Sequence, residues 1–301
     1  MKCNICPREC GADRENGQLG VCGVDNKIYV ARVGLHMWEE PCISGDKGSG
    51  TVFFIGCPLG CIYCQNYEIS NKNNREATAW SEYLLRKKKT VNELADSFID
   101  LQNMGANNIN LVTPTHYSEQ IINAVEIARM KGLSLPIVYN CSGYEKVETL
   151  RRLAGIVDIY LTDFKYANNE LAVKYSRAFN YVEVAKEALN EMVNQCPQFE
   201  FDEKGMMRKG VIVRNLLLPG NVKNSKEVAK YVYETYGDRV FLSLMNQYTP
   251  LEQAEGMEAL NRKVTKREYD KLVDYVIELG AKNVFIQEGD VASESFIPDF
   301  D

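Results

Sequence analysis

Along most of the chain, apolar residues either recur with the period of a helix or form short runs that are typical of buried strands. From Thr90 to Gly105 the apolar residues recur every three or four positions, as on one face of a helix. Thr90 and Glu93 have the spacing of a capping box, and Gly105 ends the segment. A strand is predicted to follow at residues 108–112. The pattern therefore predicts a helix that leads into a buried strand.

The same succession continues to the end of the chain. Further helices are predicted at residues 118–131, 144–153, 181–194, 225–236 and 266–279. Strands are predicted at residues 51–55, 108–112, 136–140, 157–162, 210–216, 239–245 and 283–287. Strands that alternate with helices predict a parallel sheet with right-handed crossovers. About seven such strands suit an α/β fold that is a partial or nearly closed (β/α) barrel.

Two regions do not follow this alternation. Residues 27–32 predict a strand or hairpin, and residues 67–89 predict a loop with a short helix near Glu82. We therefore divide the chain into a cysteine-rich N-terminal segment, residues 1–47, and a barrel domain with a C-terminal tail, residues 48–301.

Composition and charge limit the cellular location and the partners that we expect for the protein. Of 301 residues 45% are hydrophobic, and no run of eighteen apolar residues occurs. The first residues do not resemble a signal peptide, so we expect a cytoplasmic protein without a membrane partner. The net charge of −6 gives no reason to expect nucleic acid as a partner. Ten cysteines without an export signal favour metal or redox chemistry over disulfides.

Three cysteines lie close together directly after the first predicted barrel strand. Cys57, Cys61 and Cys64 have C-x3-C-x2-C spacing, and Gly56 and Gly60 allow the loop to curl. Thiolates are the usual ligands of iron–sulfur clusters, and a four-iron cluster normally takes four. Three cysteines would leave one iron open to another ligand. Buried thiols, three zinc ligands, or a ferredoxin-like cluster with Cys42 or Cys141 as the fourth ligand are the alternatives.

A second group of cysteines lies near the N-terminus. Cys3, Cys6, Cys10 and Cys22 occupy a glycine-rich segment with little apolar content. A structural zinc or a second iron–sulfur cluster would order such a segment, because metal binding contributes folding free energy. The alternative is a flexible arm with redox-active thiols.

The loop from Phe54 to Asn66, with Tyr63 before and Gln65 after the last cysteine, resembles the radical S-adenosylmethionine (SAM) superfamily. It is most similar to relatives of the pyruvate formate-lyase activating enzyme. The resemblance implies a [4Fe-4S] cluster on the three loop cysteines, with SAM bound at the open iron. It also implies reductive cleavage of SAM to a 5′-deoxyadenosyl radical that abstracts hydrogen from a substrate. The electron would come from a reductant such as flavodoxin or ferredoxin.

In barrels of this kind the chemistry lies at the carboxyl ends of the strands. Asp163 and Lys165 resemble the Asp-Leu-Lys of the activating enzymes and point to the same face, because they are two residues apart on a strand. They match the ammonium and carboxylate of SAM, or else pair with each other as a buried ion pair. The residues predicted to bind SAM are Tyr63, Gln65, Thr113, Thr115, His116, Asn140, Ser142, Asp163, Lys165 and Asn215.

The sequence departs from the family at two of these places. Thr113, Thr115 and His116 stand where the family usually has Gly-Gly-Glu, so ammonium recognition would fall to them or to backbone carbonyls. Asn215 stands where the family has a histidine that contacts the nucleoside. An amide can donate and accept hydrogen bonds, so this role could survive the change.

The sequence therefore predicts a radical SAM enzyme, and the resemblance implies a glycine of a glycyl radical enzyme as its target. Radical modification of a small molecule or peptide is the alternative substrate class. A non-catalytic iron–sulfur electron carrier is the alternative of another class. A carrier would not need the polar groups found at four other strand ends.

Overall fold

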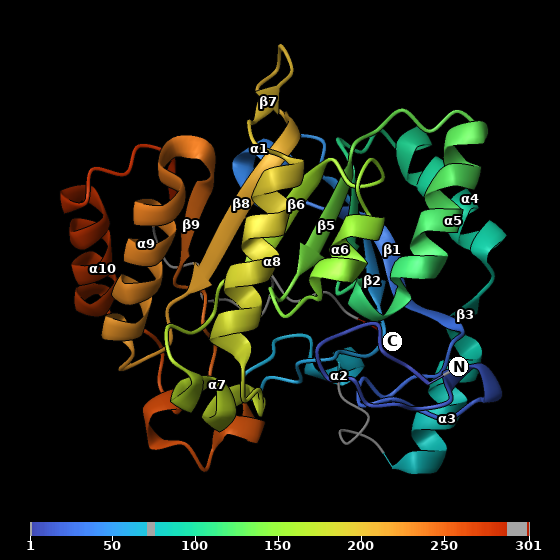
Figure 1. Cartoon of the computed structure of the whole chain (residues 1–301), viewed down its shortest axis with the longest axis horizontal. Coiled ribbons are helices and arrows are strands. Elements are labelled where there is room, and N and C mark those ends of the chain that lie inside the picture. The colour runs from blue at the N-terminus through green and yellow to red at the C-terminus, as the bar shows by residue number, and fades with distance from the viewer. Residues whose placement is uncertain (1, 71–75, 288–299, 301) are drawn as a thin grey trace.

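Seven parallel strands form the centre of the structure, a computed structural model that describes residues 2–70, 76–287 and 300 (Figure 1). They are β2 (Ser49–Phe54), β4 (Ile109–Val112), β5 (Ile137–Cys141), β6 (Ile159–Asp163), β8 (Met207–Leu216), β9 (Phe241–Met245) and β10 (Val284–Ile286). The predicted α/β fold with about seven barrel strands is confirmed.

Three further strands extend this sheet. β1 (Ile28–His36) pairs antiparallel with β2, and β3 (Lys88–Lys89) pairs with β1. β7 (Glu200–Phe201) pairs with β8. The strand order is β10-β9-β8-β6-β5-β4-β2-β1-β3, and within the described residues no pairing joins β10 to β1 or β3. The barrel is therefore partial, and β1 lies in the same sheet as the strands beyond the predicted boundary at residue 48.

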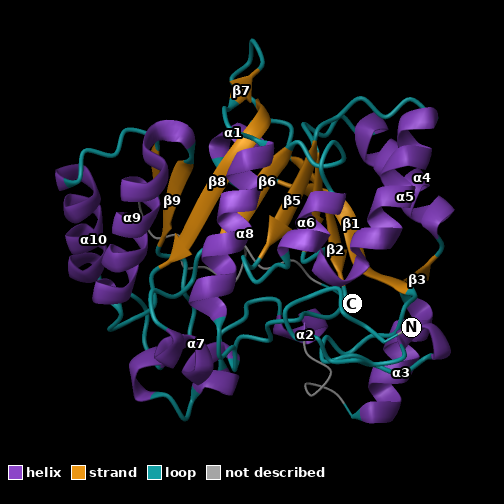
Figure 2. Cartoon of the chain, in the orientation of Figure 1, coloured by secondary structure: helices purple, strands orange, loops and turns teal. Residues whose placement is uncertain are grey.

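Most helices cover one face of the sheet, the near face in Figures 1 and 2. These outer helices are α4 (Val91–Asn103), α5 (Ser118–Met130), α6 (Val147–Arg152), α8 (Tyr181–Gln195), α9 (Val222–Tyr236) and α10 (Lys266–Glu278). Thr90 and Thr265 form the predicted capping boxes of α4 and α10. Each box satisfies backbone N–H groups that a helix start leaves without partners.

Smaller helices lie at the two ends of the sheet. α1 (Pro41–Ser44) lies at the amino ends of the strands, whereas α2 (Tyr67–Ser70), α3 (Ala77–Arg86) and α7 (Asn169–Ser176) lie toward the carboxyl ends (Figure 1). The predicted loop at residues 67–89 is wrong in part, because α2, α3 and β3 occupy much of it; the helix near Glu82 is confirmed as α3. Residues 288–299, which hold most of the predicted tail, lie outside the described residues.

The inner face of the sheet is apolar at its amino end and polar toward its carboxyl end. Cys42 and Ile43 of α1 form one apolar cluster with Val138, Leu161 and Ile212 of three neighbouring strands. Two positions further along each strand, on the same face, stand the polar residues Asn140, Asp163 and Arg214. The alternation of side chains thus places an apolar floor beneath a polar cavity wall.

Candidate functional site

A cavity of about 500 Å³ opens on the inner face at the carboxyl ends of the strands. This volume lies within the roughly 300–1,000 Å³ that is usual for small-molecule sites. Its lining comes from the cysteine loop, from the segment before α1 and from eight strands. No helix among the described residues is long and apolar enough to span a membrane.

All three loop cysteines line this cavity. The Sγ of Cys57 accepts hydrogen bonds from the backbone N–H groups of Leu59 (3.4 Å) and Gly60 (3.5 Å). The Sγ of Cys61 accepts one from the hydroxyl of Ser176, at 2.9 Å. Burial raises the pKa of Cys57 to about 12 and also raises that of Cys64. Metal binding at this loop must therefore displace thiol protons.

The backbone of the loop is held by the N-terminal segment. The N–H of Cys57 donates to the carbonyl of Cys22 at 3.2 Å. Gly56 has a φ of +91°, and a Cβ on it would lie 2.6 Å from that same carbonyl oxygen. A glycine is therefore required where the strand turns into the cysteine loop.

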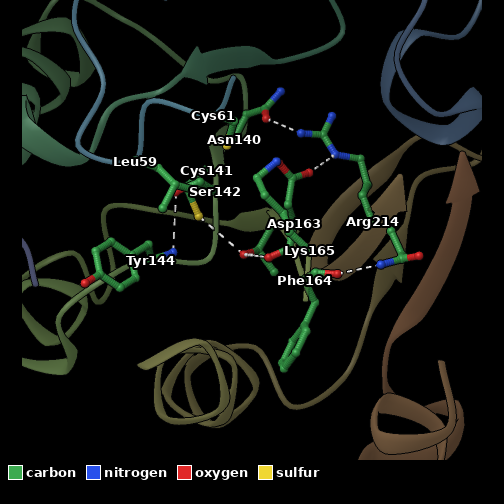
Figure 3. A network of polar contacts seen from close by, with 12 residues as sticks. Leu59, Cys61, Asn140, Cys141, Ser142, Tyr144, Asp163, Phe164, Lys165 and Arg214 are labelled. Atoms are coloured by element: carbon green, nitrogen blue, oxygen red, sulfur yellow. Dashed lines mark hydrogen bonds and ion pairs between the residues drawn. The ribbon is translucent and has the colours of Figure 1, made fainter. Parts of the chain in front are cut away.

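Charged side chains form another part of the cavity wall. The carboxylate of Asp163 accepts hydrogen bonds from Nζ of Lys165 (2.7 Å) and Nε of Arg214 (3.0 Å). Figure 3 shows these two cations converging on Asp163, with Asn140 bonded to Arg214 at 2.6 Å. Burial alone would raise the pKa of Asp163, but Lys165 and Arg214 hold that pKa below its usual value. Asp163 therefore stays ionised beside both cations.

A second acid reaches this wall from the segment before α1. Glu39 pairs with Nη1 of Arg214 at 3.2 Å and accepts hydrogen bonds from the amides of Asn110 (3.0 Å) and Asn140 (3.3 Å). Burial raises the pKa of Glu39, although Arg214 opposes this effect. One arginine thus bridges two partly buried acids in the polar wall of the cavity.

The structure brings most of the predicted SAM-binding residues together. The cavity is lined by Tyr63, Gln65, Thr113, Asn140, Ser142, Asp163 and Lys165 in addition to the three cysteines. Among these residues the amide of Gln65 donates to the carbonyl of Gln247 at 2.6 Å, which links the cysteine loop to the end of β9. That these side chains bind SAM stays a prediction.

Thr115 and His116 do not line the cavity, so the prediction that they reach it is wrong. Both belong to a 3₁₀ turn after β4 and are buried. The hydroxyl of Thr115 donates to Glu145 at 2.7 Å, and Nε2 of His116 lies 2.9 Å from the carbonyl of Ile55. Burial, with Arg14 nearby, lowers the pKa of His116 to about 3. The turn directs both side chains into the packing beneath the N-terminal segment.

The prediction that Asn215 reaches the cavity is also wrong. It is buried on the outer face of β8, where its amide donates to the carbonyl of Phe164 at 2.7 Å. Its neighbour Arg214 takes the cavity position instead, and sequence reasoning missed it. Arg214 pairs in register with Asp163, which the sequence did single out. Asp163 and Lys165 are two residues apart and share a face of the sheet. Applying the same alternation to the neighbouring strand, in register with Asp163, would have identified Arg214.

The four N-terminal cysteines lie near one another without forming disulfides. A Cβ on Gly20 would lie 3.5 Å from Sγ of Cys10 and 3.2 Å from Sγ of Cys22. Arg14 contacts Sγ of Cys3 at 3.9 Å. In residues 2–70, 76–287 and 300, no group of three or more His, Cys, Asp or Glu side chains is arranged around a single metal ion. A zinc or second cluster at these cysteines stays a prediction.

Residues 51–198 match the sequence profile of the Radical SAM superfamily. This match includes the cysteine loop and four of the strands that surround the cavity. Residues 51–198 therefore form a radical SAM domain. Such a domain implies a [4Fe-4S] cluster and SAM, and the site fits them, since three soft sulfur donors and a set of charged side chains line the same cavity. The cysteines of a cubane bind different irons, so they need not surround one ion.

Individual proteins are similar over most of this chain. An uncharacterized protein of Methanocaldococcus jannaschii, MJ0674, is 28% identical over 274 residues, which cover 90% of this chain and 73% of that protein. The structure of Streptococcus suis SuiB bound to S-adenosylmethionine has a TM-score of 0.47 at 15% identity, covering 77% of this chain and 48% of SuiB. Methylornithine synthase (PylB) has a TM-score of 0.49 at 16% identity, covering 76% and 67%. The chain thus spans about half the length of SuiB.

Proposed function

We propose that this protein is an enzyme that cleaves SAM reductively and uses the cleavage to abstract hydrogen from a substrate in the cavity. One observation carries the proposal: Cys57, Cys61 and Cys64 line the same cavity as the charged side chains of Asp163 and Lys165. An electron carrier would need the cysteines but not the charged wall. With a [4Fe-4S] cluster and SAM bound, the site would supply one-electron reduction and hydrogen-atom abstraction.

The residues of the chain would bind and orient the reactants. The three thiolates would hold the cluster. Asp163 is ionised and could accept hydrogen bonds from an ammonium group, while Lys165 and Arg214 could each donate to a carboxylate. Because the cations already bond Asp163, the wall is arranged before a ligand enters, which lowers the entropy lost on binding.

The test is turnover of SAM by anaerobically reconstituted protein. With dithionite and SAM, the wild type should release 5′-deoxyadenosine, and Cys61→Ala should release none. Cys196→Ala is the matched control, since Cys196 is a buried cysteine that does not line the cavity. If a fully loaded cluster yields no 5′-deoxyadenosine, the enzyme proposal fails and the electron carrier takes its place.

For the substrate, we propose a glycine of a glycyl radical enzyme. Support comes from the resemblance of Asp163-Phe164-Lys165 to the activating enzymes. Incubation with candidate glycyl radical enzymes, SAM and reductant should give the electron paramagnetic resonance doublet of a glycyl radical. SAM cleavage without that doublet would favour a small molecule or peptide as the substrate.

A further inference from the structure

A chain of hydroxyl groups ends at one of the three loop cysteines. The hydroxyl of Tyr63 lies 2.7 Å from that of Tyr166, which lies 2.6 Å from the hydroxyl of Ser176. The hydroxyl of Ser176 in turn lies 2.9 Å from Sγ of Cys61. The three hydroxyl-bearing residues are buried. These hydrogen bonds therefore form away from bulk water.

The sulfur fixes the direction of every hydrogen bond in this chain. A thiolate that ligates metal can only accept, so the hydroxyl of Ser176 must donate to Cys61. The one proton of Ser176 is then used, and its oxygen accepts from Tyr166. Tyr166 accepts from Tyr63 for the same reason. The three hydroxyls thus align their dipoles toward the sulfur.

The backbone around Ser176 is tied to the cysteine loop. The N–H of Ile62 donates to the carbonyl of Tyr175 at 2.9 Å. Arg8 donates to the carbonyls of Pro58 (2.8 Å) and Leu59 (3.1 Å) in the loop and to that of Ser176 (2.9 Å) at the end of α7. These contacts keep the hydroxyl of Ser176 at its distance from Cys61.

We propose that Ser176 is a positioning residue that raises the reduction potential of the cluster through its hydrogen bond to Cys61, with Tyr166 and Tyr63 orienting its hydroxyl. Reduction adds one electron, supplied by a low-potential donor, to the cluster and its sulfur ligands. A donated hydrogen bond stabilises the added negative charge, and hydrogen bonds to the sulfurs are a known control of cluster potential. The inference rests on the proposed cluster at Cys57, Cys61 and Cys64.

The test is a potentiometric titration of the reconstituted cluster without SAM or substrate, followed by electron paramagnetic resonance. Ser176→Ala should lower the midpoint potential so that the ratio of reduced to oxidised cluster falls about tenfold at a given potential, a shift of about 59 mV for one electron. Ser176→Thr should restore most of it. Tyr166→Phe should give a smaller shift in the same direction, and Tyr63→Phe the smallest.

Ser97→Ala is the matched control. It removes a buried hydroxyl that donates to the carbonyl of Glu93 within α4, at 2.8 Å, and should leave the potential unchanged. A second readout is the coupling of an exchangeable proton to the reduced cluster, which should be lost in Ser176→Ala. Neither measurement would respond to a merely structural role.

An unchanged potential in Ser176→Ala with wild-type iron content would overturn the inference. If that variant does not bind the cluster, Tyr166→Phe decides, since an unchanged potential there has the same consequence. Failure of the wild type to bind a four-iron cluster would remove the proposed function as well. If the cluster forms but SAM is not cleaved, the proposed function fails, and the midpoint potential still tests this inference.

Discussion

The two faces of the central strands bury polar groups in different ways. On the inner face, Asp163 lies against two cations, Lys165 and Arg214. On the outer face, buried Glu145 accepts hydrogen bonds from the hydroxyls of Thr115 (2.7 Å) and Tyr139 (3.2 Å). Of these two carboxyl groups, the one on the cavity side has basic partners and the other has hydroxyl partners.

The pKa values follow from this difference. Burial raises the pKa of Glu145 to about 8, so its carboxyl group is largely protonated at neutral pH. Burial acts in the same direction on Asp163, yet its cationic neighbours hold its pKa low. Asp163 thus keeps its charge on the cavity face, whereas Glu145 is largely neutral on the face covered by helices. A buried charge is costly unless paired, so its retention at the cavity favours a role in binding a charged ligand.

The largest effect is expected from breaking the inner network. Arg214→Met leaves Glu39 without its cation and Asp163 with only one. Removing one partner of a buried ion pair typically costs about 3–5 kcal/mol, and we expect a loss of this size in the free energy of unfolding. Urea unfolding of the metal-free protein at pH 7 measures it.

Lys230→Met is the control for Arg214→Met, because it removes an exposed pair with Glu234 and should cost about 0–1 kcal/mol. If the two variants lose the same stability, Arg214 does not hold the two acids together as described.

The second largest effect is expected at the cysteine loop, which Arg8 ties to the N-terminal segment. Arg8→Ala removes the hydrogen bonds from Arg8 to the carbonyls of Pro58 and Leu59 and its stacking on Tyr144. A hydrogen bond that involves a charged group contributes about 1.5–3 kcal/mol. We therefore expect the free energy of unfolding to fall by about 2 kcal/mol. The iron content after reconstitution should also be lower. Arg8→Lys should recover only part, because an ammonium cannot make the forked contacts.

Arg129→Ala provides the comparison for Arg8→Ala. Arg129 likewise donates to backbone carbonyls, those of Gly155 and Ile156, but away from the cysteine loop. It should lower stability without lowering the iron content. Equal iron content in the Arg8 and Arg129 variants would contradict the link between the N-terminal segment and the loop.

The helix and strand pattern could be predicted because it is local. The capping boxes at Thr90 and Thr265 and the C-x3-C-x2-C loop are signals confined to a few residues, and the structure contains the helices and the strand expected beside them. The choice between Arg214 and Asn215 is also local in principle. It depends on which face each residue of β8 occupies, and the neighbouring strand supplies that register.

Other parts of the site depend on contacts distant in sequence. Glu39 comes from a segment with no clear period and meets Arg214 across 175 residues. His116 follows a predicted strand end, yet a 3₁₀ turn directs it toward Ile55 rather than the cavity. Ser176 lies in α7, which the pattern did not predict. Sequence period gives the face of a regular element, whereas irregular turns and long-range contacts require the three-dimensional structure.

The third effect concerns the outer face and depends on pH. Glu145 has a folded pKa of about 8 against about 4.3 for an unfolded glutamate. Its contribution to stability is fully present below about pH 4.3 and is lost as the pH rises toward 8, because the unfolded chain releases the proton first. Urea midpoints of the wild type should therefore fall with rising pH in this window relative to those of Glu145→Gln. Parallel pH profiles would show that Glu145 is ionised in the folded protein.

The smallest effect is expected at Thr113, where the inner face borders the cavity. Thr113 has a φ of +59° at the end of β4, a left-handed conformation that costs a β-branched residue about 1–2 kcal/mol. Its N–H donates to the carbonyl of Asn140 at 2.9 Å, which fixes this conformation. Such strain often accompanies a functional position. Asparagine tolerates the left-handed region, so Thr113→Asn should raise the free energy of unfolding by up to about 1 kcal/mol.

If the strain serves ligand binding, the same variant should bind SAM more weakly when calorimetry is done anaerobically on cluster-loaded protein. Arg177→Asn is the control, since Arg177 also has a positive φ, +51°, and its side chain does not line the cavity. It should gain stability without losing SAM affinity. Equal SAM affinity in both variants, with equal gains in stability, would show that Thr113 is a strained turn residue without a part in binding. Weaker binding in Thr113→Asn alone would place the strain among the features that distinguish the cavity face of the strands from their outer face.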